Sequence, residues 1–340
     1  MFGFRKRRAV KRIIANTLKL LLVIYILIFV VGPLVYKYSY SLQRSVIFLN
    51  FVNIPPNPDY SDPPKYGIYG VRNFYLTTDD GIKLGVWQIL PNRLLNKNIT
   101  MDENYYRKAL KNGQDVIIYN HGNSGNRIVA HRIELYKVLR KNFHVIAYDY
   151  RSYGDSSNIE PSEVGVVNDS KFVCKWVRSV TSSNIFVWGH SLGTAISTHT
   201  LALLNAENIV PTGLILESPF NNMRDEISEH PFSKMFRHLP WFSYTIIEPM
   251  QENNFTFQSD KHITKVDCPI LILHAKDDMI VPYYLGEKLY KTAVANRLET
   301  QGKVHFHSFD ENLNYGHKLI CRSPELEDIL KQVTFDNFIM

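Results

Sequence analysis

The feature that most constrains the fold is an alternation of short apolar runs with longer amphipathic segments. The apolar runs are Val116–Tyr119, Val145–Tyr148, Ile185–Trp188, Leu214–Leu216, Ile270–Leu273 and Val304–Phe309. The amphipathic segments include Ile128–Lys141, Val164–Val180 and Thr194–Leu204. Mostly apolar strands separated by helices predict an α/β fold with a mostly parallel, doubly wound sheet. The stretch from Phe74 to Leu90 alternates residue by residue and predicts a hairpin with its turn at Asp79-Asp80-Gly81.

The positive charge of the chain is concentrated in its first residues. Residues 1–19 contain seven Lys and Arg side chains and no Asp or Glu, and the formal net charge of the whole chain is +7. The rest of the chain is therefore close to neutral. Because the basic charge belongs to a short tail, it does not imply a phosphate-binding groove, and we expect no nucleic-acid partner.

An uncharged, apolar segment, Leu20–Tyr36, follows this tail. It has the length of a short membrane-spanning helix, and the long Lys19 side chain can extend the usable span backwards. A cleaved signal peptide is the alternative, but no small-residue cleavage site follows the apolar run. We predict a basic cytosolic tail over residues 1–16 and one transmembrane anchor in the bilayer over residues 17–36. The excess of basic residues before the anchor sends the rest of the chain across the membrane.

Beyond the anchor, the chain divides into a linker and one domain. Residues 37–69 contain several prolines and predict an irregular, stiff linker. Residues 70–340 form the α/β domain, in which the interval of about 220–267 lacks a clear strand. This insertion is either a lid over a site or additional core packing. Its many large aromatic side chains favour a lid or an apolar channel.

The segment Gly189-His190-Ser191-Leu192-Gly193 lies between a predicted strand and a predicted helix. A serine on a sharp strand-to-helix turn exposes its hydroxyl group, and glycines two residues before and after it leave room for the strained backbone. This context is typical of the nucleophile elbow of the α/β-hydrolase fold, with Ser191 as the nucleophile. Gly189, His190 and Gly193 complete the elbow, and the tight turn is expected to point His190 away from the nucleophile.

A serine hydroxyl group needs a general base that removes its proton. In this fold the acid, and then the histidine, follow the serine along the chain. His317 is the best placed of the twelve histidines because it lies in a loop between the last predicted strand and the final helix. Asp277 and Asp278 compete as the acid. Val281-Pro282 follows Asp278 after two residues, and this spacing, typical of hydrolases of this fold, favours Asp278.

The oxyanion formed during acyl transfer requires backbone N–H donors. One donor is expected from Leu192, the residue after the nucleophile. The other is expected from Asn123, in the loop after Val116–Tyr119. A plain glycine-rich turn is the alternative for this loop, whereas a phosphate-binding loop is excluded because it lacks the Gly-Lys-Ser/Thr ending. This chemistry needs no metal, and we expect no cofactor.

Several blocks of the sequence together form a specific pattern. They are Asn120–Asn126, Asp149–Ser156, Trp188–Gly193, Leu216–Asn222, His230–Phe232, Leu273–Pro282, Tyr315–Lys318 and Ser323–Leu326. From about Trp87 to Leu330 the chain resembles the α/β-hydrolase domain-containing protein 12 family, which has a similar anchor. One departure is Ser152, where the family usually has glycine.

This resemblance implies a lipase for lysophosphatidylserine and monoacylglycerols. It implies a location in the endoplasmic-reticulum membrane with the catalytic domain in the lumen; an extracellular domain at the plasma membrane is the alternative. It also implies that Ser191, Asp278 and His317 form the triad. The same chemistry could instead serve a protein S-acyl thioester or a peptide bond, although no propeller-like domain precedes the core. A non-catalytic adhesion protein would usually have lost the serine or the histidine.

Further residues concern the head group and the compartment. Arg127, Arg132 and Arg151 lie in or beside loops at the strand ends, where they could bind an anionic head group or simply be paired or solvated. Glycosylation sequons begin at Asn98, Asn168 and Asn254, and they fit a lumenal domain. With three cysteines, one pair is possible and one thiol is left over, so their number does not decide the redox compartment.

Overall fold

The computed structural model describes residues 2–96 and 101–331, with side chains from residue 7 onward. Its centre is an eight-stranded sheet with the order β1-β2-β4-β3-β5-β6-β7-β8. The strands are β1 Val71–Thr77, β2 Lys83–Ile89, β3 Val116–Asn120, β4 His144–Tyr148, β5 Ile185–His190, β6 Gly213–Glu217, β7 Ile270–Ala275 and β8 Val304–Phe309. β2 pairs antiparallel with β1 and β4, and the other neighbours are parallel. The predicted hairpin and mostly parallel sheet are confirmed.

Side chains of the central strands alternate between two cores, one on each face of the sheet. In β3, Val116 and Ile118 pack into one core, whereas Ile117 and Tyr119 pack into the other. Both faces of β3 to β7 are buried, which explains why these strands lack a polar face. Residues of α6, α7 and α11 contribute to the first core, and residues of α5 and α12 to the second. These helices are α5 Ala130–Leu139, α6 Glu163–Val180, α7 Leu192–Ala206, α11 Tyr283–Asn296 and α12 Leu326–Lys331; the short α4, Glu103–Ala109, packs beside β2.

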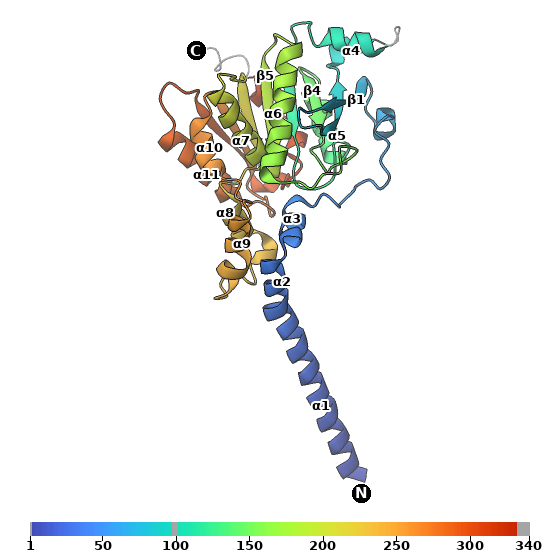
Figure 1. The fold of residues 1–340 in the computed structure, drawn as a ribbon, viewed down its shortest axis with the longest axis vertical. Coiled ribbons are helices and arrows are strands. Elements are labelled where there is room, and N and C mark those ends of the chain that lie inside the picture. Colours follow the sequence, from blue (N-terminus) through green and yellow to red (C-terminus); the bar gives the residue numbers. More distant parts are fainter. Residues whose placement is uncertain (1, 97–100, 332–340) are drawn as a thin grey trace.

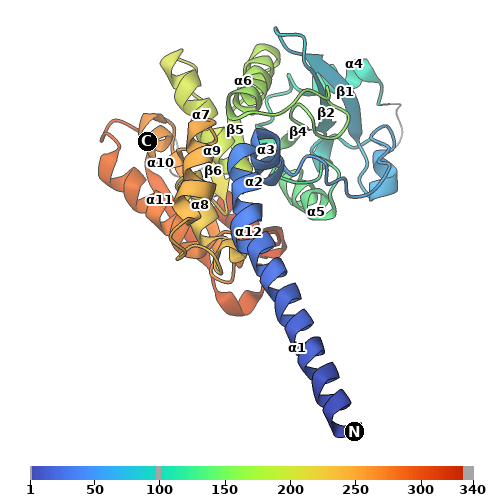
Figure 2. The same cartoon turned by 60° about the horizontal axis from the view of Figure 1, so that its bottom comes forward.

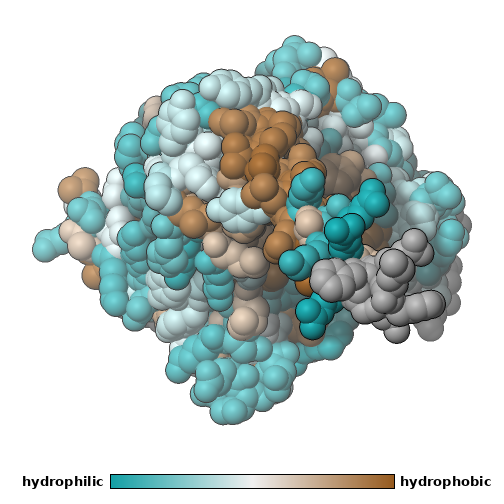
Figure 3. All heavy atoms as spheres, turned by 90° about the horizontal axis from the view of Figure 1, so that it is seen from below, coloured by the Kyte–Doolittle hydropathy of each residue, from teal (hydrophilic) through white to brown (hydrophobic). Residues whose placement is uncertain are grey.

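The N-terminal helix projects away from the body (Figure 1). α1, Phe2–Ile26, continues through a π-helical turn, Leu27–Val31, into α2, Gly32–Tyr38. The segment Arg7–Tyr38 is long and apolar enough to cross a membrane, and almost none of it is buried in the protein. Seen from below, with this helix pointing towards the viewer, apolar side chains form a continuous area along it beyond its hydrophilic N-terminal end (Figure 3).

The expected irregular linker begins instead with a helix, α3, Tyr40–Phe48. The Ser39 hydroxyl group caps it by accepting a hydrogen bond from the N–H of Leu42 at 3.2 Å. Phe48 is fully buried and contacts Phe255 and Phe257 of the insertion. The prolines that predicted a stiff connector begin only at Pro55, so nothing in the preceding residues prevents a helix. The first part of the linker is therefore packed onto the domain.

The insertion consists of helices and turns and contains no strand; all of its residues are described. Its helices are α8 Met223–Glu229, α9 Glu248–Glu252 and α10 Ser259–His262, with a π-helical turn at Ser243–Ile247. α8 and α9 lie beside α2 (Figures 1 and 2). The π-helical turn packs directly against α2. The insertion thus packs between the domain and the end of the N-terminal helix.

Candidate active site

Ser191 lies at the sharp turn between β5 and α7. Its backbone has φ 53° and ψ −121°, a conformation that costs free energy for any residue except glycine. The N–H group of Ser191 donates a hydrogen bond to the carbonyl oxygen of Glu217 in β6 at 3.0 Å. This bond and the start of α7 hold the strained turn, so that the Ser191 side chain faces a cavity.

The two glycines of the elbow are required by close backbone contacts. A Cβ atom on Gly189 would lie 2.4 Å from the carbonyl oxygen of Gly193. A Cβ atom on Gly193 would lie 2.0 Å from the carbonyl oxygen of Asn120 in β3. Both distances are far shorter than a van der Waals contact, so only glycine fits at either position. The helix can therefore approach β3 closely enough to bring Ser191 beside the loop that follows it.

His317 and Asp278 form a hydrogen-bonded pair in the same region. The distance between His317 Nδ1 and Asp278 Oδ2 is 2.8 Å, and His317 lines the same cavity as Ser191. The other carboxylate oxygen of Asp278 accepts hydrogen bonds from the N–H groups of Ile280 and Val281, each at 2.9 Å. Burial alone would raise the pKa of Asp278, but His317 and His274 hold this pKa well below its usual range. Asp278 is therefore an anion that fixes the orientation of the His317 ring.

Asp277 has a different place. Its Oδ2 atom accepts a hydrogen bond from the N–H group of Gly316 at 2.9 Å. Gly316 directly precedes His317, so Asp277 braces the loop that carries the histidine. The two neighbouring aspartates thus contact one loop, Asp278 through the imidazole ring and Asp277 through the backbone.

His190 is closer to the catalytic groups than expected. Its Nε2 atom lies 2.8 Å from the carbonyl oxygen of His317, and the two rings are 4.9 Å apart. Burial lowers the pKa of His190 well below its usual value, so the ring is neutral and donates its Nε2 hydrogen to that oxygen. Because His190 faces the histidine loop from the elbow, it positions His317. The expectation that the turn points His190 away from the nucleophile did not foresee this contact with the His317 loop.

The loop after β3 lies against the nucleophile. A Cβ atom on Gly122 would be 3.3 Å from Cβ of Ser191, and Asn123 and Leu192 line the cavity together with Ser191. The single hydrogen of the Tyr153 hydroxyl group is shared between the carbonyl oxygen of Phe48, which is nearer, and that of Asn123, at 3.2 Å. This contact helps to hold the loop beside the position where an oxyanion would form.

The three arginines considered for the head group are all buried and engaged. Arg127 is paired with Asp149 and Asp155, and Arg151 is paired with Asp169; neither arginine lines the cavity. Arg132 does line it, but its guanidinium group donates to the carbonyl oxygens of Asn126 and Ser124 at 2.7 and 2.6 Å. Arg132 therefore braces the loop of Asn123, whereas Arg127 and Arg151 stabilise the domain from within. A sequence contains no direct signal for such pairing.

The cavity above Ser191 has a volume of about 570 Å³ and is mostly apolar. Its apolar lining comes from α2, from α3 and the residue after it, from the elbow, from the insertion and from the loop after β7: Tyr36, Val46, Ile47, Leu49, Leu192, Phe220, Met223, Ile227, Phe232, Ile246 and Ile280. The insertion therefore forms part of the site. The contribution of α2 and α3 was not foreseen, because Tyr36 was assigned to the membrane anchor and the residues of α3 to the irregular linker.

Glu226 and Lys318 are the charged residues of the cavity that sequence reasoning missed. Burial, together with the negative charge of Asp278, raises the pKa of Glu226 to about 8. The Oε2 atom of Glu226 is buried and has no hydrogen-bond partner among the described residues. Lys318 is exposed at the cavity and forms no ion pair with any described residue. The one sequence signal that could have identified Lys318 as a residue of the site is its position directly after His317.

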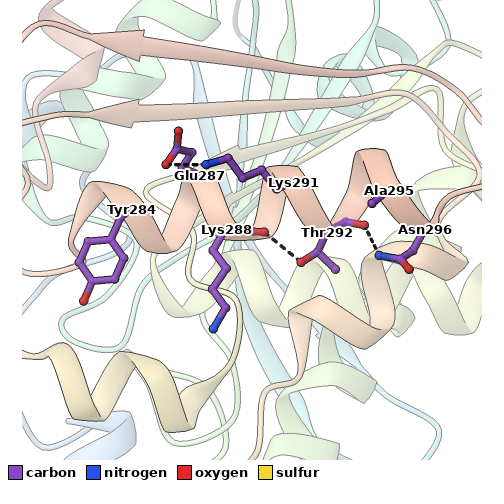
Figure 4. Close-up of a pocket in the computed structure, with 7 residues that line it drawn as sticks. All are labelled: Tyr284, Glu287, Lys288, Lys291, Thr292, Ala295 and Asn296. Atoms are coloured by element: carbon purple, nitrogen blue, oxygen red, sulfur yellow. Dashed lines mark hydrogen bonds and ion pairs between the residues drawn. The ribbon is translucent and has the colours of Figure 1, made fainter.

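Two other places bear on ligand binding. A shallow hollow along the outer face of α11 is lined by seven residues of that one helix (Figure 4). The side chains that line the hollow interact mainly within the helix, as in the pair Glu287–Lys291.

Glu163, His199 and His262 lie close enough to hold a metal ion. However, Glu163 Oε2 accepts hydrogen bonds from the N–H groups of Thr256 and Phe257, and the imidazole rings stack at 3.7 Å. Glu163 thus already has the structural role of holding the base of the insertion.

The sequons and cysteines are placed as follows. Asn168, on α6, and Asn254, after α9, are exposed, whereas Asn98 lies outside the described residues. The three cysteines are buried and none is in a disulfide. Ser152, where the family usually has glycine, has φ 68°, which explains the preference for glycine at this position.

The fold and the elbow define the class of protein. Residues 115–261 match a family model described as alpha/beta hydrolase fold. Among solved structures, an α/β hydrolase from Vibrio vulnificus matches with a TM-score of 0.60 at 17% identity, covering 89% of this chain and 93% of that one. An esterase from Pyrococcus furiosus matches with a TM-score of 0.58 at 18% identity, covering 83% and 96%. The protein is an α/β hydrolase by fold.

Closer relatives identify the family within this class. The chain is 39% identical over 305 residues to the lysophosphatidylserine lipase ABHD12 of Danio rerio, covering 89% of this chain and 80% of that protein. It is 33% identical over 283 residues to the human protein ABHD12B, covering 83% and 77%. The chain belongs to the ABHD12 family, as the sequence blocks indicated.

Proposed function

We propose that this protein is a membrane-anchored serine hydrolase that cleaves carboxylic esters of single-chain lipids. The observation that carries this proposal is the 2.8 Å contact between His317 and Asp278 in the cavity that Ser191 faces. Ser191 Oγ attacks the ester carbonyl carbon while His317 Nε2 accepts its proton. The backbone N–H groups of Asn123 and Leu192 stabilise the resulting oxyanion.

The reaction is completed by the same groups in reverse. His317 gives the proton to the leaving alcohol as its bond to the acyl carbon breaks, and an acyl ester of Ser191 remains. Water then attacks this ester, losing its proton to His317, and the fatty acid leaves as Ser191 recovers its proton. Asp278 stays ionised throughout and stabilises the imidazolium ion.

The cavity supports a lipid with one acyl chain. Its volume of about 570 Å³ is within the ordinary range for small-molecule sites, and most of its lining is apolar. Each methylene group that leaves water contributes about 0.8 kcal/mol to binding. The names of the relatives suggest lysophosphatidylserine as one substrate, and we propose monoacylglycerols as another.

Two charged residues fit the head group of lysophosphatidylserine better than the buried arginines do. Lys318 offers a cation to the phosphate at the exposed part of the cavity. Glu226 offers a carboxyl group whose Oε2 atom accepts no hydrogen bond from the part of the chain that the structure describes. A carboxyl group with a raised pKa can donate a hydrogen bond, and it can become an anion when an ammonium group approaches it.

The purified protein is expected to hydrolyse lysophosphatidylserine and monoacylglycerol well, and an S-acyl peptide hardly at all. Lysophosphatidylcholine and a diacyl phospholipid complete the panel. Lys318→Met should lower kcat/KM for lysophosphatidylserine by roughly twofold to fivefold, the effect of one exposed charge, and leave monoacylglycerol unaffected. Released fatty acid is measured, with Ser191→Ala as the blank. A strong preference for the S-acyl peptide would replace the lipase by a thioesterase with the same mechanism.

We also propose that the protein spans the endoplasmic-reticulum membrane once, with residues 1–16 in the cytosol and the domain in the lumen. In intact microsomes the domain should be protected from added protease, and an endoglycosidase should shift the mobility of the full chain. Substituting Gln at Asn98, Asn168 and Asn254 together should remove this shift. Protease digestion of the domain without detergent, combined with no shift, would contradict the orientation. Surface biotinylation of intact cells would distinguish the plasma membrane.

A further inference from the structure

The part of the insertion from residue 231 to 247, called the insertion tip below, touches the N-terminal helix within its apolar span. The ring of Phe236 lies 5.6 Å from the ring of Phe29, centroid to centroid. The Lys37 ammonium group lies over the ring of Tyr244. Next to the tip, the Tyr36 hydroxyl group donates a hydrogen bond to Sδ of Met250 at 2.9 Å. The insertion therefore contacts the N-terminal helix at its C-terminal end, at Tyr36 and Lys37, and also further back, at Phe29.

The contact with Phe29 sets the depth of the tip. Phe29 precedes Lys37 by eight residues, which corresponds to about 12 Å along a helix. Lys37 is the first charged residue after the apolar span and marks the edge of the membrane on the side of the domain. If the helix spans the bilayer, as proposed above, Phe236 lies at the depth of the acyl chains, where interfacial elements insert by about 5–10 Å.

The surface of the tip suits this position. Phe232, Met235 and Tyr244 are 83%, 75% and 51% exposed, which is unusual for large apolar side chains in one short segment. Residues 231–247 contain no Asp or Glu. Their basic groups, which include Lys234, suit the head groups of anionic lipids. In water this surface would be a liability, whereas in a bilayer it is stabilising.

The same segment forms part of the cavity wall. Phe232, Ser233 and Ile246 of the tip line the cavity that Ser191 faces, together with Tyr36 of α2 and Val46 of α3. The wall is thus shared by the end of the spanning helix and by the element that touches its apolar span. A cavity mouth between these elements would face the bilayer that the helix is proposed to span.

We propose that the insertion tip is a second membrane-contacting element, immersed in the leaflet on the side of the domain. The cavity then receives its single-chain lipid directly from that leaflet, without passage of the acyl chain through water. This proposal rests on the proposed membrane anchor, and the experiment below separates the two.

The full-length protein is reconstituted in vesicles of phosphatidylcholine and phosphatidylserine, with an environment-sensitive fluorophore on one introduced cysteine. Met235→Cys reports the tip, Ile28→Cys the anchor, and Val294→Cys an exposed site on α11 (57% exposed). The three native cysteines are buried and react poorly. We expect a quencher attached to the lipid acyl chains to quench residues 28 and 235 but not 294. Quenching at 28 alone would overturn the inference and leave the anchor intact, whereas quenching at neither 28 nor 235 would overturn both.

A kinetic experiment tests the consequence for substrate entry. Met235 does not line the cavity, so Met235→Asp leaves the catalytic groups in place. It should lower the rate with monoacylglycerol embedded in vesicles on the order of tenfold, because a carboxylate is poorly tolerated in the bilayer. The rate with a short-chain, water-soluble ester should not change, and Val294→Asp should affect neither substrate. Equal rates of Met235→Asp and wild type on the embedded lipid would contradict direct entry from the leaflet.

Discussion

Replacing Ser191 with alanine is expected to lower ester turnover by roughly 10³-fold or more, the size of effect seen when a triad member is removed. The strained φ of 53° is held by the hydrogen bond to Glu217 and by the start of α7, neither of which involves the hydroxyl group. Alanine tolerates this conformation about as well as serine does, so the fold should be retained. The measurement is kcat with monoacylglycerol for the variant and the wild type.

Thermal unfolding provides the control for this variant. A midpoint within a few degrees of the wild type would assign the loss of activity to chemistry. Near-normal turnover in a folded Ser191→Ala protein would show that another group attacks the ester.

The second large effect is expected from Asp278→Asn. An amide in place of the carboxylate stabilises the wrong tautomer of His317 and cannot stabilise its imidazolium form, so kcat should fall by roughly 10⁴-fold. The adjacent substitution, Asp277→Asn, is a matched control. Among the described residues, the carboxylate of Asp277 accepts a hydrogen bond only from the N–H group of Gly316, and the amide oxygen of Asn can still accept that bond. We expect a loss of less than about tenfold.

The comparison of the two variants depends only on which aspartate contacts the imidazole ring. A larger loss for Asp277→Asn than for Asp278→Asn would contradict the contact between Asp278 and His317. Equal, small losses would indicate that neither carboxylate participates in the reaction.

The sheet could be predicted because its strands carry a strong local signal. β3 to β7 are buried on both faces, so their sequences are continuous apolar runs, and turn residues mark their ends. The elbow was predictable for a related reason. Gly189 and Gly193 are fixed by backbone contacts that no other residue permits, and they leave a spacing that is visible in the sequence.

The surroundings of the site were less predictable because they depend on contacts between distant segments. Nothing near Arg127 in sequence shows that it pairs with Asp149 and Asp155. Likewise, α3 is helical partly because Phe48 packs against the insertion more than 200 residues later. The hydrogen bond between His190 and the carbonyl oxygen of His317 also joins residues that are far apart in the sequence. Local patterns predict elements, whereas long-range pairing decides which charged groups remain available to a ligand.

The central claim, that Ser191 is the nucleophile, is tested most directly by locating a covalent adduct. The full-length protein is treated with a fluorophosphonate, which reacts with an activated serine, and the modified peptide is identified by mass spectrometry. We predict one adduct, on Ser191, which is absent from the Ser191→Ala protein and strongly reduced in a folded His317→Ala protein. An adduct on a different serine, or undiminished labelling of folded Ser191→Ala, would contradict the assignment.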